Sequence, residues 1–229
     1  MRSKCAVATL MEESEDRDVY VGDLTTHAHF IASVLRQTTV ADWLKQELDG
    51  YPEDQDIDVP YRRVRDCRLL AWRPDMGWSR APINAALNEK LAEYQIHQGI
   101  QELEALDLTQ IDRQRRDSLV IEFSEARQRK LRVETRLVTY LALEVPASGQ
   151  AILLESLRGT IRAWAGALQA AGVNGEGGAF SKASRRLASE VSASLPELIA
   201  TAHQHAMEQA AAPLPKKRTG LLARLRGEG

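Results

Sequence analysis

The chain has 229 residues, of which 44% are hydrophobic and 27% are charged; this is ordinary usage for a folded globular protein and excludes wholesale disorder. The 30 basic and 32 acidic residues leave a net charge of −2, so no overall field favours a nucleic-acid or membrane surface. Two cysteines without CxxC spacing, a start without signal-peptide character and apolar runs far short of the roughly 20 residues of a membrane span predict a cytoplasmic protein.

The first part of the chain predicts two consecutive helices. Residues 24–49 place apolar side chains at helical intervals, and Thr38 or Thr39 is positioned to cap the second helix. That helix is expected to end at Gly50, because glycine readily takes a positive φ and a proline follows two residues later. The acidic segment 53–58 resembles the start of a calcium loop but lacks its later glycine and glutamate, so we predict a solvated loop.

The middle of the chain mixes strand and helix patterns. Residues 59–83 are rich in Tyr, Val, Arg and Trp around the turn sequence 74–77, which predicts a β-hairpin. We expect a long helix over 84–106 and another over 112–130, each with an apolar face. The later part of 131–145 is rich in strand-forming residues and predicts a third strand.

Three further helices are expected in the C-terminal half. Apolar residues recur at helical intervals over 153–168, and two glycines there permit the close approach of a neighbour. After a glycine-rich loop, Ser181 is placed to cap the next helix. Ser194 and Glu197 form a capping-box pattern that predicts the start of the last helix.

These elements predict an α+β, predominantly helical fold, in which amphipathic helices pack with a small antiparallel sheet of two to three strands. We interpret residues 1–208 as one domain and residues 209–229 as a basic, flexible tail. The tail gathers cations at Lys216, Lys217 and Arg218. It is a terminus without fixed structure, a short helix that docks on a protein partner, or a phosphate contact, for which we expect nucleic acid rather than a membrane.

The sequence contains no recognisable catalytic or metal-binding constellation. Its two close histidine pairs have i,i+2 spacing, which points the rings in different directions on a helix. Glu93 and His97 share a helix face, but a di-metal carboxylate site needs a second such pair. The glycines of 175–178 fit neither common phosphate-binding pattern, and Glu176 would place a negative charge beside a phosphate. We therefore predict no cofactor, no metal ion and no catalytic residue.

One motif is specific enough to indicate a family. The pattern W-x-x-x-E-L-x-G-Y-P runs from Trp43 to Pro52, and Val-Pro-Tyr-Arg follows at 59–62. Similar features continue with Pro-Ile after the hairpin, GIQELEAL at 99–106, Val-Pro leading into ILLESLRGTIRAWAGAL, and the GEGGAFS loop. In these segments the chain resembles the AbiTii domain of bacterial abortive-infection proteins, and the resemblance covers about residues 20–185.

The resemblance implies a component of an anti-phage defence system. Together with the missing active site, it favours a protein that acts by sensing, scaffolding or oligomerising, with itself or with another defence protein as its partner. The alternative is a toxin enzyme, a nuclease or a nucleotide-degrading activity, with an unfamiliar acidic and basic site. Interfaces favour Trp, Tyr and Arg, although packing within the fold is the competing interpretation for such residues in the motif. The candidate interaction residues are Trp43, Tyr51, Tyr61, Arg62, Glu176, Lys216, Lys217 and Arg218.

Overall fold

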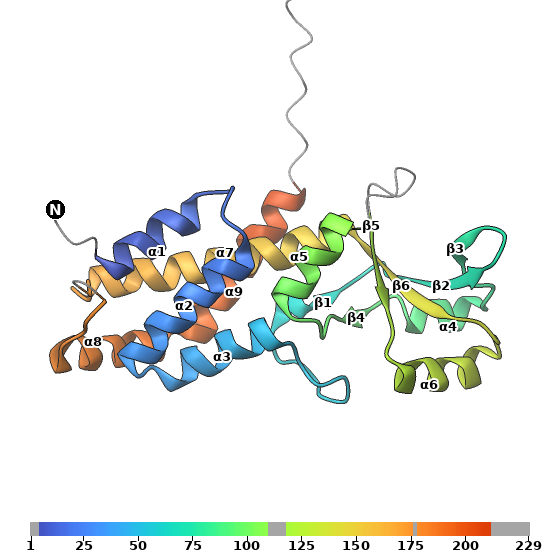
Figure 1. The fold of residues 1–229 in the computed structure, drawn as a ribbon, viewed down its shortest axis with the longest axis horizontal. Coiled ribbons are helices and arrows are strands. Elements are labelled where there is room, and N and C mark those ends of the chain that lie inside the picture. The colour runs from blue at the N-terminus through green and yellow to red at the C-terminus, as the bar shows by residue number, and fades with distance from the viewer. Residues whose placement is uncertain (1–4, 110–117, 176–177, 212–229) are drawn as a thin grey trace, which may run out of the picture.

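The computed structural model describes residues 5–109, 118–175 and 178–211, and Figure 1 shows an elongated molecule with long helices at one end and a sheet with short helices at the other. The helices are α1 (Ala6–Glu15), α2 (Val21–Leu35), α3 (Thr38–Asp49), α4 (Ala85–Lys90), α5 (Ile100–Thr109), α6 (Glu125–Thr135), α7 (Ala147–Ala170), α8 (Lys182–Ser192) and α9 (Leu195–Ala211). The strands are β1 (Arg63–Val64), β2 (Arg68–Arg73), β3 (Gly77–Arg80), β4 (Tyr94–Gln95), β5 (Ser118–Glu122) and β6 (Leu141–Pro146), and the short 3₁₀ turn η1 (Pro60–Arg62) precedes β1.

The predicted fold class is confirmed, but the sheet is larger than the two to three strands expected. The main sheet has the order β3-β2-β6-β5, all antiparallel, and β1 pairs separately with β4. The helix predicted over 112–130 is wrong at Ser118–Glu122, where the chain forms β5, and is confirmed only from Glu125, where α6 begins. Residues 110–117 lie outside the described part of the chain.

The long helix predicted over 84–106 is also wrong. Asn84 caps a short helix, α4, by accepting a hydrogen bond from the backbone N–H of Leu87, and that helix ends at Lys90. The chain then forms β4 and re-enters a helix only at Ile100. At Gly99 an added Cβ would lie 2.2 Å from the carbonyl oxygen of Leu48, so the backbone here packs directly against the end of α3.

Helix α7 is the centre of the helical body, where it packs against α1, α2, α8 and α9. Its apolar face confirms the predicted amphipathic helix, since the predicted face is fully buried: Leu153, Leu157, Ile161, Trp164 and Leu168. An added Cβ at Gly159 would lie 3.3 Å from the Cβ of Ala202 in α9. This glycine therefore allows the close helix approach expected from the sequence.

The main sheet alternates its side chains between two faces. Leu69 and Ala71 of β2 point into the main core, while Leu70 and Trp72 point to the opposite face. On that face Leu70 packs with Ala142 and with residues of the neighbouring strands in a small second cluster. The sheet thus extends the core on one side and presents a separate surface on the other.

The helix ends test the predicted caps. Gly50 takes the expected positive φ, 85°, and Ser181 accepts a hydrogen bond from the N–H of Ser184 at 3.0 Å, so both predictions are confirmed. The cap at Thr38 or Thr39 is wrong, because Gln37 occupies that position and its side chain instead contacts Trp164 and Ala188. The Ser194 hydroxyl donates to the carbonyl of Val191.

Candidate functional site: a buried ion-pair cluster and the pocket beside it

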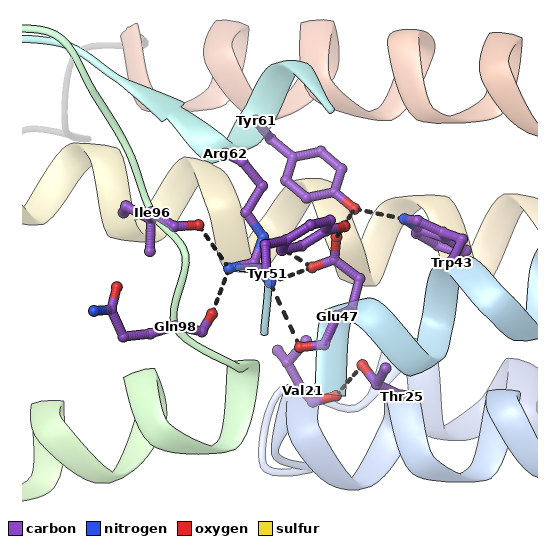
Figure 2. Close-up of polar contacts among 9 residues, drawn as sticks. All are labelled: Val21, Thr25, Trp43, Glu47, Tyr51, Tyr61, Arg62, Ile96 and Gln98. Atoms are coloured by element: carbon purple, nitrogen blue, oxygen red, sulfur yellow. Dashed lines mark hydrogen bonds and ion pairs between the residues drawn. The ribbon is translucent and has the colours of Figure 1, made fainter. Parts of the chain in front are cut away.

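The family-like motif folds into a buried polar cluster between α3 and η1 (Figure 2). Trp43 and Glu47 are four residues apart and lie on one face of α3, and Tyr51 follows one turn later. Gly50 makes this possible, because its positive φ turns the chain at the end of α3. Arg62 comes from η1, and its side chain and that of Glu47 are both 0% exposed.

The Glu47 carboxylate accepts four hydrogen bonds from three side chains. Its Oε1 accepts from the hydroxyls of Tyr51 at 2.7 Å and Tyr61 at 3.0 Å. Its Oε2 accepts from Nε and one terminal nitrogen of Arg62, at 3.1 and 2.5 Å. Trp43 extends the network by donating its indole N–H to the Tyr61 hydroxyl at 3.0 Å. This arrangement satisfies a charge that would be very costly to bury alone.

The remaining donors of Arg62 bind backbone carbonyls, that of Glu47 on α3 and two on a distant segment. One terminal nitrogen donates to the carbonyls of Ile96 at 3.2 Å and Gln98 at 2.6 Å. The guanidinium also lies 5.1 Å from the centre of the Tyr51 ring, within the range of a cation–π contact. Arg62 therefore joins three segments: α3, η1 and the chain that leads into α5.

Burial and the charge of Glu47 shift the pKa values of three members of the cluster: Arg62, Tyr51 and Tyr61. Burial lowers the pKa of Arg62, but the adjacent Glu47 carboxylate outweighs this effect and the net pKa is raised. Burial, together with the negative charge of Glu47, raises the pKa of Tyr51 and of Tyr61 well above the ordinary range. The arginine therefore stays charged and both phenols stay protonated near neutral pH.

The structure brings together four of the predicted interaction residues, and all four are buried. Trp43 is 6% exposed, Tyr51 7%, Tyr61 1% and Arg62 0%, so their side chains face one another rather than the surface. Glu47 is the member that the sequence interpretation did not single out, although it is a letter of the motif. The other predicted residues, Glu176, Lys216, Lys217 and Arg218, lie outside the described part of the chain.

A pocket of about 520 Å³ lies next to the cluster, on the other side of Tyr61. It opens between the segment 57–66, the start of α7 and the second half of α9. Its lining includes polar side chains, among them carboxylates and guanidinium groups: Asp58, Arg63, Arg65, Asp66, Ser148 and His203. In the described structure, this pocket is the place beside the motif where ionisable side chains line an open cavity.

His203 is the group in this pocket with the clearest chemical preference. Its Nδ1 lies 3.3 Å from the Ser156 hydroxyl oxygen, and that hydroxyl donates to the carbonyl of Ile152. The ring therefore donates from Nδ1, which leaves Nε2 as an acceptor in the neutral form. Burial lowers the pKa of His203, which favours this neutral form.

Metal binding has no support among the residues that the structure describes, since no group of three or more His, Cys, Asp or Glu side chains there could hold an ion. The aspartates of segment 53–58 lie in an irregular loop, and Asp56 makes an ion pair with Arg63 at 3.8 Å. None of the described helices is long and apolar enough to cross a membrane.

In a comparison with protein families, the AbiTii model matches residues 7–193. The chain belongs to the AbiTii family. The matched region contains the whole buried cluster and extends from α1 to the end of α8. No curated protein and no solved structure matches the chain. Membership makes this AbiTii protein a component of abortive-infection defence against phage.

Proposed function

We propose that this AbiTii protein acts in phage defence by binding a partner through an exposed apolar surface at the end of its sheet. This sheet-end surface consists of Trp72, Met76, Trp78, Val138 and Tyr140. The proposal rests on the exposure of its large apolar side chains: Trp72 is 42% exposed, Met76 64%, Val138 100% and Tyr140 64%. Large exposed apolar side chains gathered at one end of a fold are characteristic of interaction sites.

The backbone explains why these residues lie together. Trp72 pairs with Trp78 across the β2–β3 hairpin, and Met76 lies in the turn of that hairpin. The backbone N–H of Trp72 donates to the carbonyl of Tyr140 at 2.9 Å, which brings the loop before β6 to the same end of the sheet. Figure 1 shows the β2–β3 hairpin at the end of the molecule opposite the α1 and α8 helices.

The buried cluster supports this function by fixing the chain that leads through β1 into β2. Arg62 precedes β1 directly and is bonded to α3 and to the chain before α5. A binding surface on a rigid support loses less conformational entropy when it meets its partner. The motif residues are therefore assigned to the scaffold, and the sheet-end surface to recognition.

Phage protection by the full chain tests the proposal. The efficiency of phage plating is compared for cells that express the unchanged chain, the Trp72→Ala variant and the Phe30→Ala variant. Phe30 is the matched control, because it is an aromatic side chain 58% exposed on α2 in the helical body. We expect Trp72→Ala to lose protection at an unchanged melting temperature, and Phe30→Ala to keep it. Equal protection by both variants would refute the assignment of the surface.

The pocket favours a second candidate function, a toxin enzyme. The observation that favours it is a neutral His203 whose Nδ1 is hydrogen-bonded to Ser156, in a pocket also lined by arginine and aspartate side chains. An acceptor nitrogen near such groups suits general-base catalysis on a phosphate-bearing substrate. If this function holds, overexpression stops growth and His203→Gln relieves the arrest while the protein remains folded. Growth arrest that persists in a folded His203→Gln variant rejects it.

A further inference from the structure

We infer that the partner of the sheet-end surface is single-stranded nucleic acid; the inference rests on the binding function proposed above. Three aromatic side chains form a row across the end of the sheet: Trp78 on β3, Trp72 on β2 and Tyr140 just before β6. Strand pairing sets Trp78 opposite Trp72, and the backbone bond from Trp72 to Tyr140 extends the row by one strand. We call these three residues the aromatic row.

The members of the aromatic row share one face of the sheet. Trp72 lies two residues from Leu70, and Tyr140 lies two residues from Ala142, whose side chains both point away from the main core. The rings of Trp72 and Trp78 meet edge to face, with centroids 5.3 Å apart and an angle of 75°. Aromatic side chains displayed on an antiparallel sheet are surfaces on which unpaired bases stack, and stacking needs no particular base.

Two arginines beside the row have no carboxylate partner among the described residues. No ion pair there holds Arg80, which lies two residues from Trp78 on β3, or Arg132 on α6. Arg132 instead lies 5.2 Å from the centre of the Tyr140 ring and donates from Nε to the carbonyl of Thr139. Elsewhere on the sheet cations are compensated, as Arg68 is by Glu144 at 3.9 Å. Uncompensated cations beside stacking rings match the charge of a nucleic-acid backbone.

The exposed area of Trp72 and Tyr140 alone is small beside a protein interface and suits two or three stacked bases. If a whole aromatic side chain offers about 250 Å², the exposed fractions of Trp72 and Tyr140, 42% and 64%, correspond to roughly 105 and 160 Å². A standard protein interface buries about 800 Å² on each side around an apolar centre. Two or three bases need far less area, and a duplex offers no free base faces to this row.

Fluorescence anisotropy with the full chain tests the inference. The probes are fluorescein-labelled oligo-U and oligo-dT of 12 nucleotides and a 12-base-pair DNA duplex. We expect the single strands to bind more tightly than the duplex, and Trp72→Ala to weaken binding roughly five- to 150-fold, the range for loss of one stacked base. Trp72→Phe, which keeps a stacking ring, should restore most of the affinity. Arg80→Gln should reduce the slope of log affinity against log salt by about one.

Two controls separate this surface from others. Tyr20→Ala and Phe30→Ala remove aromatic side chains that are 53% and 58% exposed in the helical body, and neither should change binding. Exchange of Lys216, Lys217 and Arg218 for glutamine tests the basic tail. If that exchange abolishes binding while Trp72→Ala leaves it intact, the aromatic row is not the site and the inference is overturned.

The outcomes distinguish the two proposals. If no single strand binds but Trp72→Ala still abolishes phage protection, the nucleic-acid inference fails and the binding function survives with a protein partner. In that case light scattering of the unchanged chain and of Trp72→Ala shows whether a second copy is that partner. If Trp72→Ala protects normally, the proposed function fails as well, whatever the oligonucleotides show.

Discussion

The buried ion pair provides a sharp test of the scaffold, through the substitution Glu47→Gln. Glutamine keeps the size of the side chain but exchanges one acceptor oxygen for a donor amide. The carboxylate accepts four hydrogen bonds, two on each oxygen. The amide can keep only two of them, and its NH₂ group would face hydrogen-bond donors of Tyr51 and Tyr61 or of Arg62. It also leaves the fully buried guanidinium of Arg62 without a counter-charge.

The expected cost follows from these losses. Breaking a buried pair by removing one partner destabilises a protein by about 3–5 kcal/mol. For a chain of this length, that corresponds to a fall of roughly 6–20 °C in melting temperature. The same helix offers a matched control in Asp49→Asn, because Lys45 and Asp49 form an ion pair whose side chains are 63% and 60% exposed. Loss of such an exposed pair should leave the stability nearly unchanged, because solvent screens it.

Urea unfolding followed by circular dichroism measures both variants, and a double-mutant cycle completes the test. Arg62→Met removes the buried charge, so we expect the double variant Glu47→Gln/Arg62→Met to be about 2 kcal/mol more stable than the sum of the single changes. The reasoning is refuted if Glu47→Gln costs no more than Asp49→Asn. It is equally refuted if the two single changes are additive.

Three more predictions concern neighbouring parts of the fold. In urea unfolding, Gly50→Ala should destabilise the protein by about 2 kcal/mol more than Gly172→Ala. Both glycines have a positive φ, but only at Gly50 would an added Cβ meet backbone, because it would lie 2.6 Å from the carbonyl oxygen of His97. Burial lowers the pKa of His97 and of His203, so the unfolded chain binds more protons below about pH 6.5. The unfolding free energy should therefore fall as the pH drops below that value, and His203→Gln should flatten the dependence measured between pH 7.5 and 5.5. Glu104→Gln should cost about 1 kcal/mol in the same unfolding assay, because the carboxylate accepts from the first two N–H groups of α2 at 2.7 and 2.9 Å; an unchanged midpoint would contradict this.

Local signals in the sequence predicted those parts of the fold that depend on a few adjacent residues. The end of α3 at Gly50, the cap at Ser181 and the hairpin around 74–77 each follow from the conformational preferences of the residues present. The face of α7 follows from a long, regular apolar period. In these places local preference and tertiary packing agree.

The errors arise where a distant segment decides the conformation. The apolar period over 84–106 suits a helix, yet Tyr94 pairs with β1 and Gly99 packs on the backbone of Leu48. The run Ser118–Glu122 is too short for its apolar pattern to separate a buried strand from a helix. Only its pairing with β6 makes it a strand, and the paired residues lie 20 to 28 positions apart in the chain.

The candidate site likewise combines local features, which the sequence predicts, with contacts between distant segments, which it does not. The end of α3 at Gly50, between Trp43 and Tyr51, was predicted from the sequence, but the partners of these two residues were not. Glu47 and Arg62 are 15 residues apart, and the carbonyls that complete the Arg62 shell lie 34 and 36 residues away. A single sequence contains no signal for such a meeting. The exposure of Trp72 was likewise hidden, because a tryptophan in a strand pattern is equally compatible with the core.

The family motif and the proposed binding surface therefore serve different physical purposes, and experiment can separate them. The motif residues are buried and hold α3, η1 and the chain before α5 together, so changes there act through stability. Trp72 and Tyr140 are exposed and contribute little to the core, so changes there act through contact with a partner. Glu47→Gln should lose phage protection in proportion to the fraction of protein that unfolds at the growth temperature, and should regain it on cooling. Trp72→Ala should lose protection equally at every temperature, because the variant lacks the contacting ring even when it is fully folded.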